Sequence, residues 1–493
     1  MPQKIISTAE NKIKQKKDIF YSSSTVFFGV LDRKKNIDTK ISFLNHFLLK
    51  RQIESVALRL SVRDLEGILL KEKIFNITKP ITYSFKLSDL LPKNIAIGEF
   101  SIFLEFTANR NLGVPFCAVS MAILSPNTID HVHTYGRALE VNEINSEIDF
   151  SKSYETGWTI ASGDDISNFA ILHNGRMFSE VGINLKLFIK GEEFFKEQIR
   201  FFKLKPFATL KLDLEKILYS SSDGIEALSR IKLSKYGEID AKINLTGLKG
   251  TFPRMLFVAL ANLGNNKEVN IFNFKYINFT HSNFDFDNAT QPSSRKNFGF
   301  INNPSYPEGI KDSGYRYFPC IDLNQVEFNN KKLGCLPFSL DPLSSMKVVS
   351  KNKIPSRIVG ENWVEWKISP IKGSCSTGTF IIENTDFNSF WHWGLLNPDP
   401  QKYKSIISII NPFSTKRDFF KFDLNLYGER GLIINKKIKF NGPNYEIYFD
   451  NKTFEPLEKT IWYSIQGEGI GSFNVFSTIY FPDLSDGTVE HAF

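Results

Sequence analysis

Short segments in which apolar and polar residues alternate recur along the chain. Clear examples are residues 55–62 (SVALRLSV), 183–189 (INLKLFI) and 420–426 (FKFDLNL). A period of two residues is typical of a β-strand that buries one face. Gly, Asn, Asp and Pro separate these segments at roughly 8–12-residue intervals, the spacing of antiparallel sandwiches. The pattern predicts a mainly β protein made of immunoglobulin-like or jelly-roll-like β-sandwiches.

Two distant parts of the chain share the same sequence pattern. Residues 28–32 (FGVLD) correspond to 393–397 (WGLLN), and residues 41–47 (ISFLNHF) correspond to 407–413 (ISIINPF). A weaker copy begins near Ile171. Because internal repeats of this kind indicate tandem structural units, we expect about three related sandwich modules.

The repeats suggest boundaries for these modules. We place them at residues 21–145, 150–290 and 375–493, after a basic N-terminal segment at residues 1–20. Residues 291–374 are rich in Asn, Pro, Ser and Gly, yet they contain several aromatic residues. We interpret this stretch as a loop-rich insertion that packs on its neighbours, because a free linker would carry fewer aromatic side chains.

Composition and charge narrow the class of protein. The 493 residues are 42% hydrophobic and 23% charged, which is too apolar for a disordered chain. The net charge of +8 comes from dispersed residues, whereas a nucleic-acid site needs basic residues concentrated beside stacking aromatics. We therefore expect no nucleic-acid partner.

The longest apolar runs are far shorter than the roughly 20 residues of a membrane-spanning helix, so no transmembrane segment is expected. The first 17 residues also lack the apolar stretch of a classical signal peptide. With only four cysteines, the interpretation is a cytoplasmic or peripheral envelope protein in which Cys117 packs as a small hydrophobic residue. A disulfide bond between Cys320 and Cys335 is left as an alternative.

Familiar catalytic motifs are absent from the sequence. It contains no phosphate-binding GxxxxGK[ST], no GxGxxG between a strand and a helix, no GxSxG and no HExxH. This absence favours a non-catalytic binding or assembly protein, with a polysaccharide or an envelope protein as candidate partner. Two alternatives stay open: a metal-dependent or glycan-processing enzyme, and a structural subunit of a phage or other assembly. The oligomeric state is not predicted.

His131 and His133 form the one pattern suited to metal binding. Alternate residues of a strand point to the same face, so both imidazoles could bind a divalent metal, although a structural or surface pair is the favoured interpretation. No other cofactor is expected. We expect each module to bury its own closing strand, which would keep His131 and His133 apart from His281 and His491. The alternative is that the closing strands converge on one site.

Aromatic clusters offer candidate binding surfaces. Such flat apolar rings can stack on sugars or anchor a partner protein, although the same residues can also be core. The candidates are Trp391, Trp393, Tyr315, Tyr317, Trp363 and Trp366. Asn45, Asn174 and Asn411 recur after the same predicted strand, where we expect their side chains to bond to the local backbone in turns.

Overall fold

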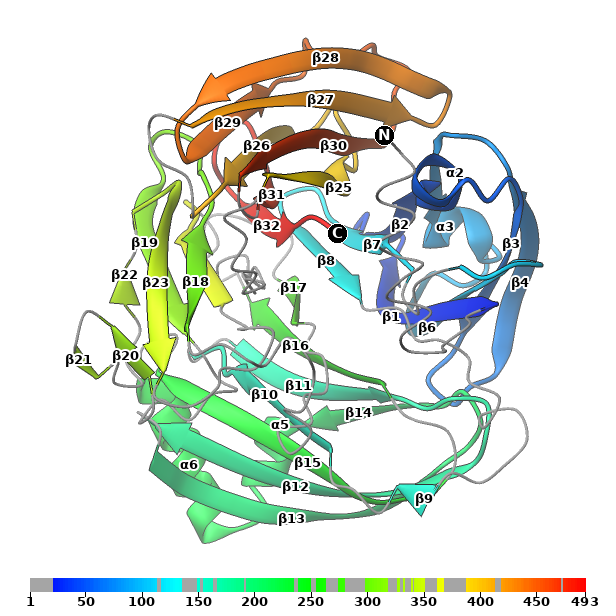
Figure 1. Cartoon of the computed structure of the whole chain (residues 1–493). Coiled ribbons are helices and arrows are strands. Elements are labelled where there is room, and N and C mark those ends of the chain that lie inside the picture. The colour runs from blue at the N-terminus through cyan, green and yellow to red at the C-terminus, as the bar shows by residue number, and fades with distance from the viewer. Residues whose placement is uncertain are drawn as a thin grey trace.

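The computed structural model confirms a mainly β fold in which antiparallel sheets pair as sandwiches. The described strands form four sandwiches that follow one another around a ring (Figure 1). The residues described are 21–112, 117–134, 149–150, 154–162, 166–189, 192–234, 238–249, 254–262, 274–279, 298–317, 326–328, 331–332, 338–339, 341–350, 361–367, 387–412, 418–470 and 473–493.

The first sandwich pairs two four-stranded sheets, in the orders β1-β6-β3-β4 and β5-β2-β7-β8. Its strands are β1 (Ser22–Asp32), β2 (Asp38–Leu44), β3 (Val56–Arg63), β4 (Leu69–Ile77), β5 (Thr82–Lys86), β6 (Ile97–Thr107), β7 (Val119–Leu124) and β8 (Ile129–Thr134). Two short helices, α2 (His46–Arg51) and α3 (Leu87–Leu90), follow β2 and β5.

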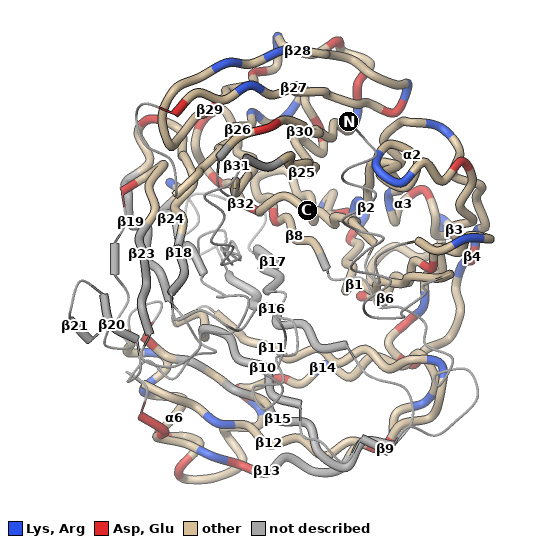
Figure 2. Tube along the Cα trace, in the orientation of Figure 1, with Lys and Arg blue, Asp and Glu red and all other residues tan. Residues whose placement is uncertain are grey.

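The last sandwich repeats this strand order, as β25-β30-β27-β28 and β29-β26-β31-β32. Its strands are β25 (Phe387–Asn397), β26 (Lys404–Ile410), β27 (Phe419–Gly428), β28 (Gly431–Asn441), β29 (Asn444–Phe449), β30 (Ile461–Ile470), β31 (Asn474–Tyr480) and β32 (Gly487–His491). The repeat seen in the sequence is therefore structural, because β1 ends at Asp32 and β25 ends at the matched Asn397. Lysine residues lie along the outer strand β28 (Figure 2).

The second sandwich has the same order again, as β10-β15-β12-β13 and β14-β11-β16-β17, with β9 paired to β15. Its strands are β9 (Asp149–Phe150), β10 (Tyr154–Thr159), β11 (Ile166–His173), β12 (Ser179–Ile189), β13 (Glu192–Leu204), β14 (Thr209–Asp213), β15 (Ile239–Lys249), β16 (Arg254–Asn262) and β17 (Phe274–Phe279).

Helices α5 (Leu214–Leu218) and α6 (Ser222–Leu233) lie between β14 and β15 of the second sandwich. The Ser221 hydroxyl caps α6 by accepting a hydrogen bond from the Gly224 N–H at 3.1 Å. The buried residues Ala227, Leu228 and Ile231 recur at helical spacing and fix the inner face of α6. Within the described part of the chain, no helix is long and apolar enough to cross a membrane.

Residues 291–374, expected to be a loop-rich insertion, carry strands in the order β18-β23-β20-β21 and β22-β19-β24. These strands are β18 (Phe298–Asn303), β19 (Lys311–Tyr317), β20 (Val326–Phe328), β21 (Lys331–Lys332), β22 (Phe338–Ser339), β23 (Ser344–Ser350) and β24 (Glu361–Glu365). The order matches the first seven strands of the other sandwiches. This insertion sandwich is thus a fourth copy of the same unit, which the sequence pattern did not indicate.

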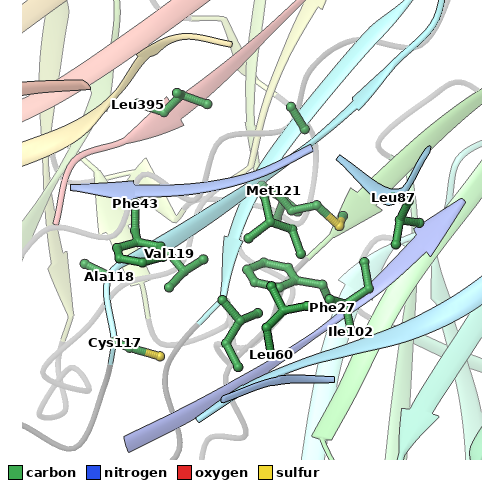
Figure 3. Close-up of a cluster of buried hydrophobic side chains, with 14 of the residues drawn as sticks. Phe27, Phe43, Leu60, Leu87, Ile102, Cys117, Ala118, Val119, Met121 and Leu395 are labelled. Carbon is green, nitrogen blue, oxygen red and sulfur yellow. The ribbon is translucent and has the colours of Figure 1, made fainter. Parts of the chain in front are cut away.

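The first and last sandwiches share one hydrophobic core. Phe27, Phe43 and Met121 fill the space between the sheets of the first sandwich, where Cys117 is also buried (Figure 3). Leu395 of the last sandwich belongs to the same buried cluster, together with Trp393, Tyr403 and Trp462. The two sandwiches are consequently packed together and are not independent beads. Cys320, Cys335 and Cys375 lie outside the described residues.

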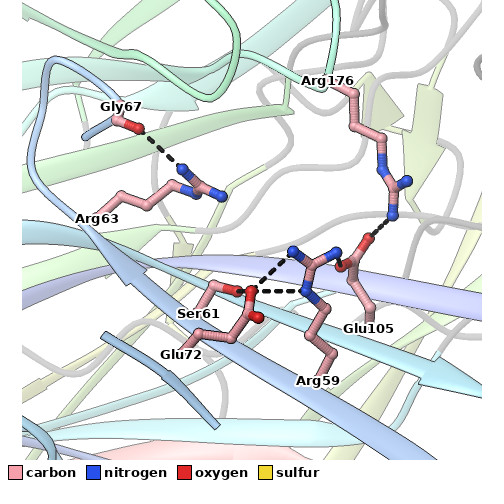
Figure 4. Close-up of polar contacts among 7 residues, drawn as sticks. All are labelled: Arg59, Ser61, Arg63, Gly67, Glu72, Glu105 and Arg176. Carbon is pink, nitrogen blue, oxygen red and sulfur yellow. Dashed lines mark hydrogen bonds and ion pairs between the residues drawn. The ribbon is translucent and has the colours of Figure 1, made fainter. Parts of the chain in front are cut away.

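Charged and polar groups connect the first sandwich to the second. The Arg176 guanidinium pairs with the Glu105 carboxylate of β6, and Arg59 pairs with Glu72 at 2.7 Å on the same sheet (Figure 4). A second ion pair joins Lys211 Nζ to Glu99 Oε1 at 2.6 Å. This interface therefore combines partly exposed charges with apolar contacts, because Phe169 and Ile171 of β11 belong to the buried cluster of the first sandwich.

The predicted bonding of the recurring asparagine side chains to the local backbone is confirmed at Asn45, whose Oδ1 accepts from the Leu48 N–H at 3.2 Å, and at Asn174. Asn45, Asn174 and Asn411 each follow the second strand of a sandwich, and each backbone N–H donates to a carbonyl shortly before the fifth strand; the acceptors belong to Ile81, Ala208 and Pro443. The Asn174 side-chain amide also donates to the Met177 carbonyl at 2.8 Å. These contacts fix the turn that leads out of each second strand.

Candidate functional site

The closing strands of the first and last sandwiches meet near the middle of the ring. β8 and β32 are edge strands of their sheets, and they contact each other (Figure 1). The Ile129 N–H donates to Asp486 Oδ2 at 2.9 Å, and the His131 N–H donates to Thr488 Oγ1 at 3.3 Å. The side chains of Thr488 of β32 and of Asp486, which directly precedes β32, thus accept hydrogen bonds from backbone donors on the edge strand β8.

Three metal-ligating side chains come together at this contact. Glu490 Oε1 lies 3.1 Å from His133 Nδ1 and 2.9 Å from His491 Nδ1. The His133 and His491 rings meet edge to face, with centroids 4.3 Å apart. The expectation that each sandwich buries its closing histidines separately is wrong for this pair, because the last sandwich packs back onto the first. His281 lies outside the described residues.

The histidines control the charge of the buried Glu490. Burial alone raises the pKa of this carboxyl group, but the charges and hydrogen bonds of His133 and His491 outweigh burial and hold the pKa well below its usual range. Glu490 and His133 are buried, whereas the His491 side chain is 14% exposed. The carboxylate is therefore ionised and paired inside the protein.

His131 is buried beside this group without a hydrogen-bond partner. Burial lowers its pKa to about 4, although the charge of Glu490 acts in the opposite direction. Neither ring nitrogen of His131 bonds to any described residue. The ring is thus neutral at pH 7, with a nitrogen lone pair available in a buried place.

Together, these side chains have the chemistry of a metal centre. The ligand atoms of His133, Glu490 and His491 all lie within 4.8 Å of one another. Two imidazoles and a carboxylate form a common zinc-binding set. The sequence pattern had found His133 and His131, but it missed Glu490 and His491 because they belong to the opposite end of the chain.

The predicted aromatic candidates differ in their accessibility. Trp393 is buried: it stacks against His46 at a centroid distance of 5.2 Å, and Lys50 Nζ lies 4.3 Å from the centre of its ring. Trp391 is half-buried against the same core. Trp366 is buried beside Tyr480. The faces of Trp393 and Trp366 are occupied by protein and are not open to a sugar ring.

The remaining aromatic candidates lie in the insertion sandwich. Tyr315 of β19 is the register partner of Trp363 of β24, and Tyr317 faces Glu361. The side chains of Tyr315, Tyr317 and Trp363 lie outside the described part of the structure. Their proposed binding role stays a prediction.

An open groove lies over the outer face of the last sandwich. It has a volume of about 490 Å³, and we call it the outer groove; its lining residues are Phe419, Lys421, Phe422, Asp423, Lys437, Ile438, Lys439, Gln466, Gly467 and Glu468. Phe419 is 50% exposed at one end of it. Sequence reasoning missed this groove, although the alternation in 420–426 could have identified the outward-facing residues Lys421 and Asp423.

Polar groups cover the floor of the outer groove in register. Lys421 pairs across the sheet with Lys439 on one side and Glu468 on the other. Asp423 pairs in the same way with Lys437 and Gln466. Adjacent strands thus present two rows of hydrogen-bonding side chains beside an aromatic ring.

A second polar cavity, of about 350 Å³, lies between the first and last sandwiches. Two of its cations, Arg33 and Lys402, donate hydrogen bonds to backbone carbonyls of the protein. Arg33 donates to the Ser88, Leu91 and Ile95 carbonyls, and Lys402 donates to the Ser125 carbonyl. We interpret this cavity as part of the interface between the two sandwiches.

Comparisons with known proteins leave the fold description as it stands. No family model and no curated protein matches the chain. Solved structures with some similarity include a putative beta-galactosidase from Bacteroides fragilis (8% identity, TM-score 0.13) and an alpha-L-rhamnosidase from Streptomyces avermitilis (7% identity, TM-score 0.16). The first match covers 58% of this chain and 34% of the other, and the second covers 94% and 43%. At these TM-scores neither match carries a functional argument.

Proposed function

We propose that this protein is a non-catalytic binding protein that holds a polysaccharide in the outer groove. The observation that carries the proposal is the half-exposed ring of Phe419 beside two rows of outward-facing polar side chains. An aromatic face next to convergent hydrogen-bonding groups is the arrangement on which sugar rings stack and are oriented.

The charges of the outer groove favour an acidic polysaccharide. Three lysines, Lys421, Lys437 and Lys439, face two carboxylates, Asp423 and Glu468. The lysines can bind sugar carboxylates, while the carboxylates and Gln466 can accept or donate hydrogen bonds to sugar hydroxyls. Polymers that contain uronic acids should therefore bind more tightly than their neutral counterparts, and this preference should weaken as salt is added.

The rigid sheet below the groove supports a binding role. The lining side chains project from β27, β28 and β30, which are paired along most of their lengths. Side chains held on a paired sheet lose little further freedom when a ligand binds, which favours affinity without a conformational change.

A glycan-array screen followed by calorimetry tests this proposal. We expect an acidic glycan to bind, and we expect Phe419→Ala to weaken its binding at least about tenfold, which corresponds to about 1.4 kcal/mol. The matched control is Leu432→Ala, because Leu432 is an exposed apolar residue of the same sheet outside the outer groove. This control should bind like the wild-type protein.

Three results would count against the proposal. Absence of binding to every glycan would exclude this ligand class. Equal affinities of the Phe419→Ala and Leu432→Ala variants would place the ligand elsewhere. Release of shortened sugars from the bound glycan would show that the protein is an enzyme.

A further inference from the structure

We propose that His133, Glu490 and His491 bind one zinc ion, which joins the closing strands of the first and last sandwiches. This site is separate from the outer groove, and it does not depend on the proposed polysaccharide ligand. The ion would bind where β8 and β32 already meet. Its ligands would come from the first and last sandwiches, so that one bound ion would connect the two sandwiches that close the ring.

The spacing of the ligand atoms fits a zinc ion. Zinc binds imidazole nitrogen at about 2.0–2.1 Å and carboxylate oxygen at about 2.0–2.2 Å in a tetrahedral arrangement, so neighbouring ligand atoms stand about 3.3 Å apart. The two distances from Glu490 Oε1 to His133 Nδ1 and His491 Nδ1 are 3.1 and 2.9 Å. Shifts of a few tenths of an ångström would therefore suffice to admit the ion.

His131 provides an independent observation that points to a ligand. Its side chain is nine-tenths or more buried, and neither ring nitrogen bonds to a described residue. Buried polar atoms of this kind are rare in native proteins unless an ion or water binds them. Because His131 lies two residues before His133 on β8, both side chains face the same side of the strand. His131 lies outside the group of ligand atoms within 4.8 Å of one another, so its ring would have to turn toward the ion to become a fourth ligand.

If His131 turned to complete the set, three histidines and one glutamate would make a closed, structural type of site. Four protein ligands leave no open position for a substrate, in contrast to catalytic zinc sites with three ligands. Nitrogen and carboxylate ligands favour zinc over calcium or magnesium, which prefer oxygen alone. The part-exposed His491 side chain gives the ion a route in from solvent.

Zinc binding should also stabilise the contact between the first and last sandwiches. An ion that binds only the folded protein favours the folded state by mass action. Removal of zinc should therefore lower the melting temperature of the full-length protein, and re-addition of zinc should restore it. Magnesium at the same concentration should not.

The first test measures the zinc content of the purified full-length protein by inductively coupled plasma mass spectrometry. The second measures zinc binding to the chelator-treated protein by calorimetry. We expect one zinc per chain. The double variant His133→Ala/His491→Ala should lose this zinc or bind it at least a hundredfold more weakly. His173→Ala is the matched control, because His173 is a buried histidine of the second sandwich outside this cluster, and it should keep one zinc per chain.

A cobalt experiment keeps the proposal testable if the double variant does not fold. Wild-type protein loaded with one cobalt ion should show the intense visible absorption of a four-coordinate site, and zinc should abolish this absorption. The single variant His491→Gln, which changes the least buried ligand, should weaken the band. Failure of the treated wild-type protein to bind zinc, or unchanged zinc affinity in the folded double variant, would overturn the proposal.

Discussion

The first sandwich contacts two neighbours in different ways. Toward the last sandwich it shares a continuous core, and the buried Trp462 Nε1–H donates to Ser42 Oγ at 2.9 Å. Toward the second sandwich fewer buried apolar side chains of the described residues join that core, namely Phe169 and Ile171 of β11, and ion pairs such as the one between Arg176 and Glu105 accompany them. Burial contributes far more to stability than partly exposed charge does. The comparison indicates that the contact between the two ends of the chain is the stronger one.

Removal of a large side chain from the shared core should have the largest effect. Trp462 is fully buried between the first and last sandwiches. We expect Trp462→Ala to lower the free energy of unfolding by about 3–5 kcal/mol, measured by urea unfolding, because it leaves a cavity and an unpaired Ser42 hydroxyl. The exposed Leu457→Ala should change it by less than about 0.5 kcal/mol. Similar values for the two variants would refute a common core.

A buried lysine at the same contact should produce a medium effect that depends on pH. Lys40 Nζ donates to the Pro398 and Lys459 carbonyls at 2.6 and 2.9 Å, while burial lowers its pKa from 10.5 to about 8. Between about pH 8 and pH 10.5, Lys40 is protonated in more of the unfolded chains than of the folded chains. Stability should therefore rise with pH through this window.

Substitution Lys40→Met would isolate this contribution. The rise in the free energy of unfolding between pH 8 and pH 10.5 should be smaller in the variant, by about 1–3 kcal/mol, because methionine does not titrate. Urea unfolding at both pH values measures the difference. An identical rise in variant and wild type would show that Lys40 keeps an ordinary pKa and is not desolvated at this interface.

The smallest effect is expected at the contact with the second sandwich. Arg176→Ala removes a partly exposed ion pair with Glu105 and should lower the free energy of unfolding by about 0.2–1 kcal/mol. The difference should shrink at high salt. A loss as large as that of Trp462→Ala, or one that salt does not change, would contradict the contrast between the two interfaces.

Much of the fold could be predicted from local sequence patterns. The alternation at 55–62 and 420–426 predicted β3 and β27, and the repeat at 28–32 and 393–397 predicted that the ends of the chain share a unit. The insertion sandwich was not predicted, because strands as short as β21 (Lys331–Lys332) are too short to show the alternation of apolar and polar residues. Strand order, not sequence similarity, relates this copy to the others.

The site could be predicted only in part, for a physical reason. A two-residue period placed His131 and His133 on one face, but it could not tell which surface that face would meet. Glu490 and His491 reach His133 only because the last sandwich folds back onto the first, and local patterns contain no information on such distant packing. The outer groove likewise depends on the shape of the sheet, which the alternation of Phe419, Lys421 and Asp423 does not reveal.

Small-angle X-ray scattering of the full-length protein tests the central claim most directly. A ring in which the last sandwich packs on the first should give a radius of gyration close to the ~23 Å of a compact chain of this length, and a single-peaked distance distribution. Four sandwiches joined end to end would give a clearly larger radius and a long tail of distances, and that result would contradict the account.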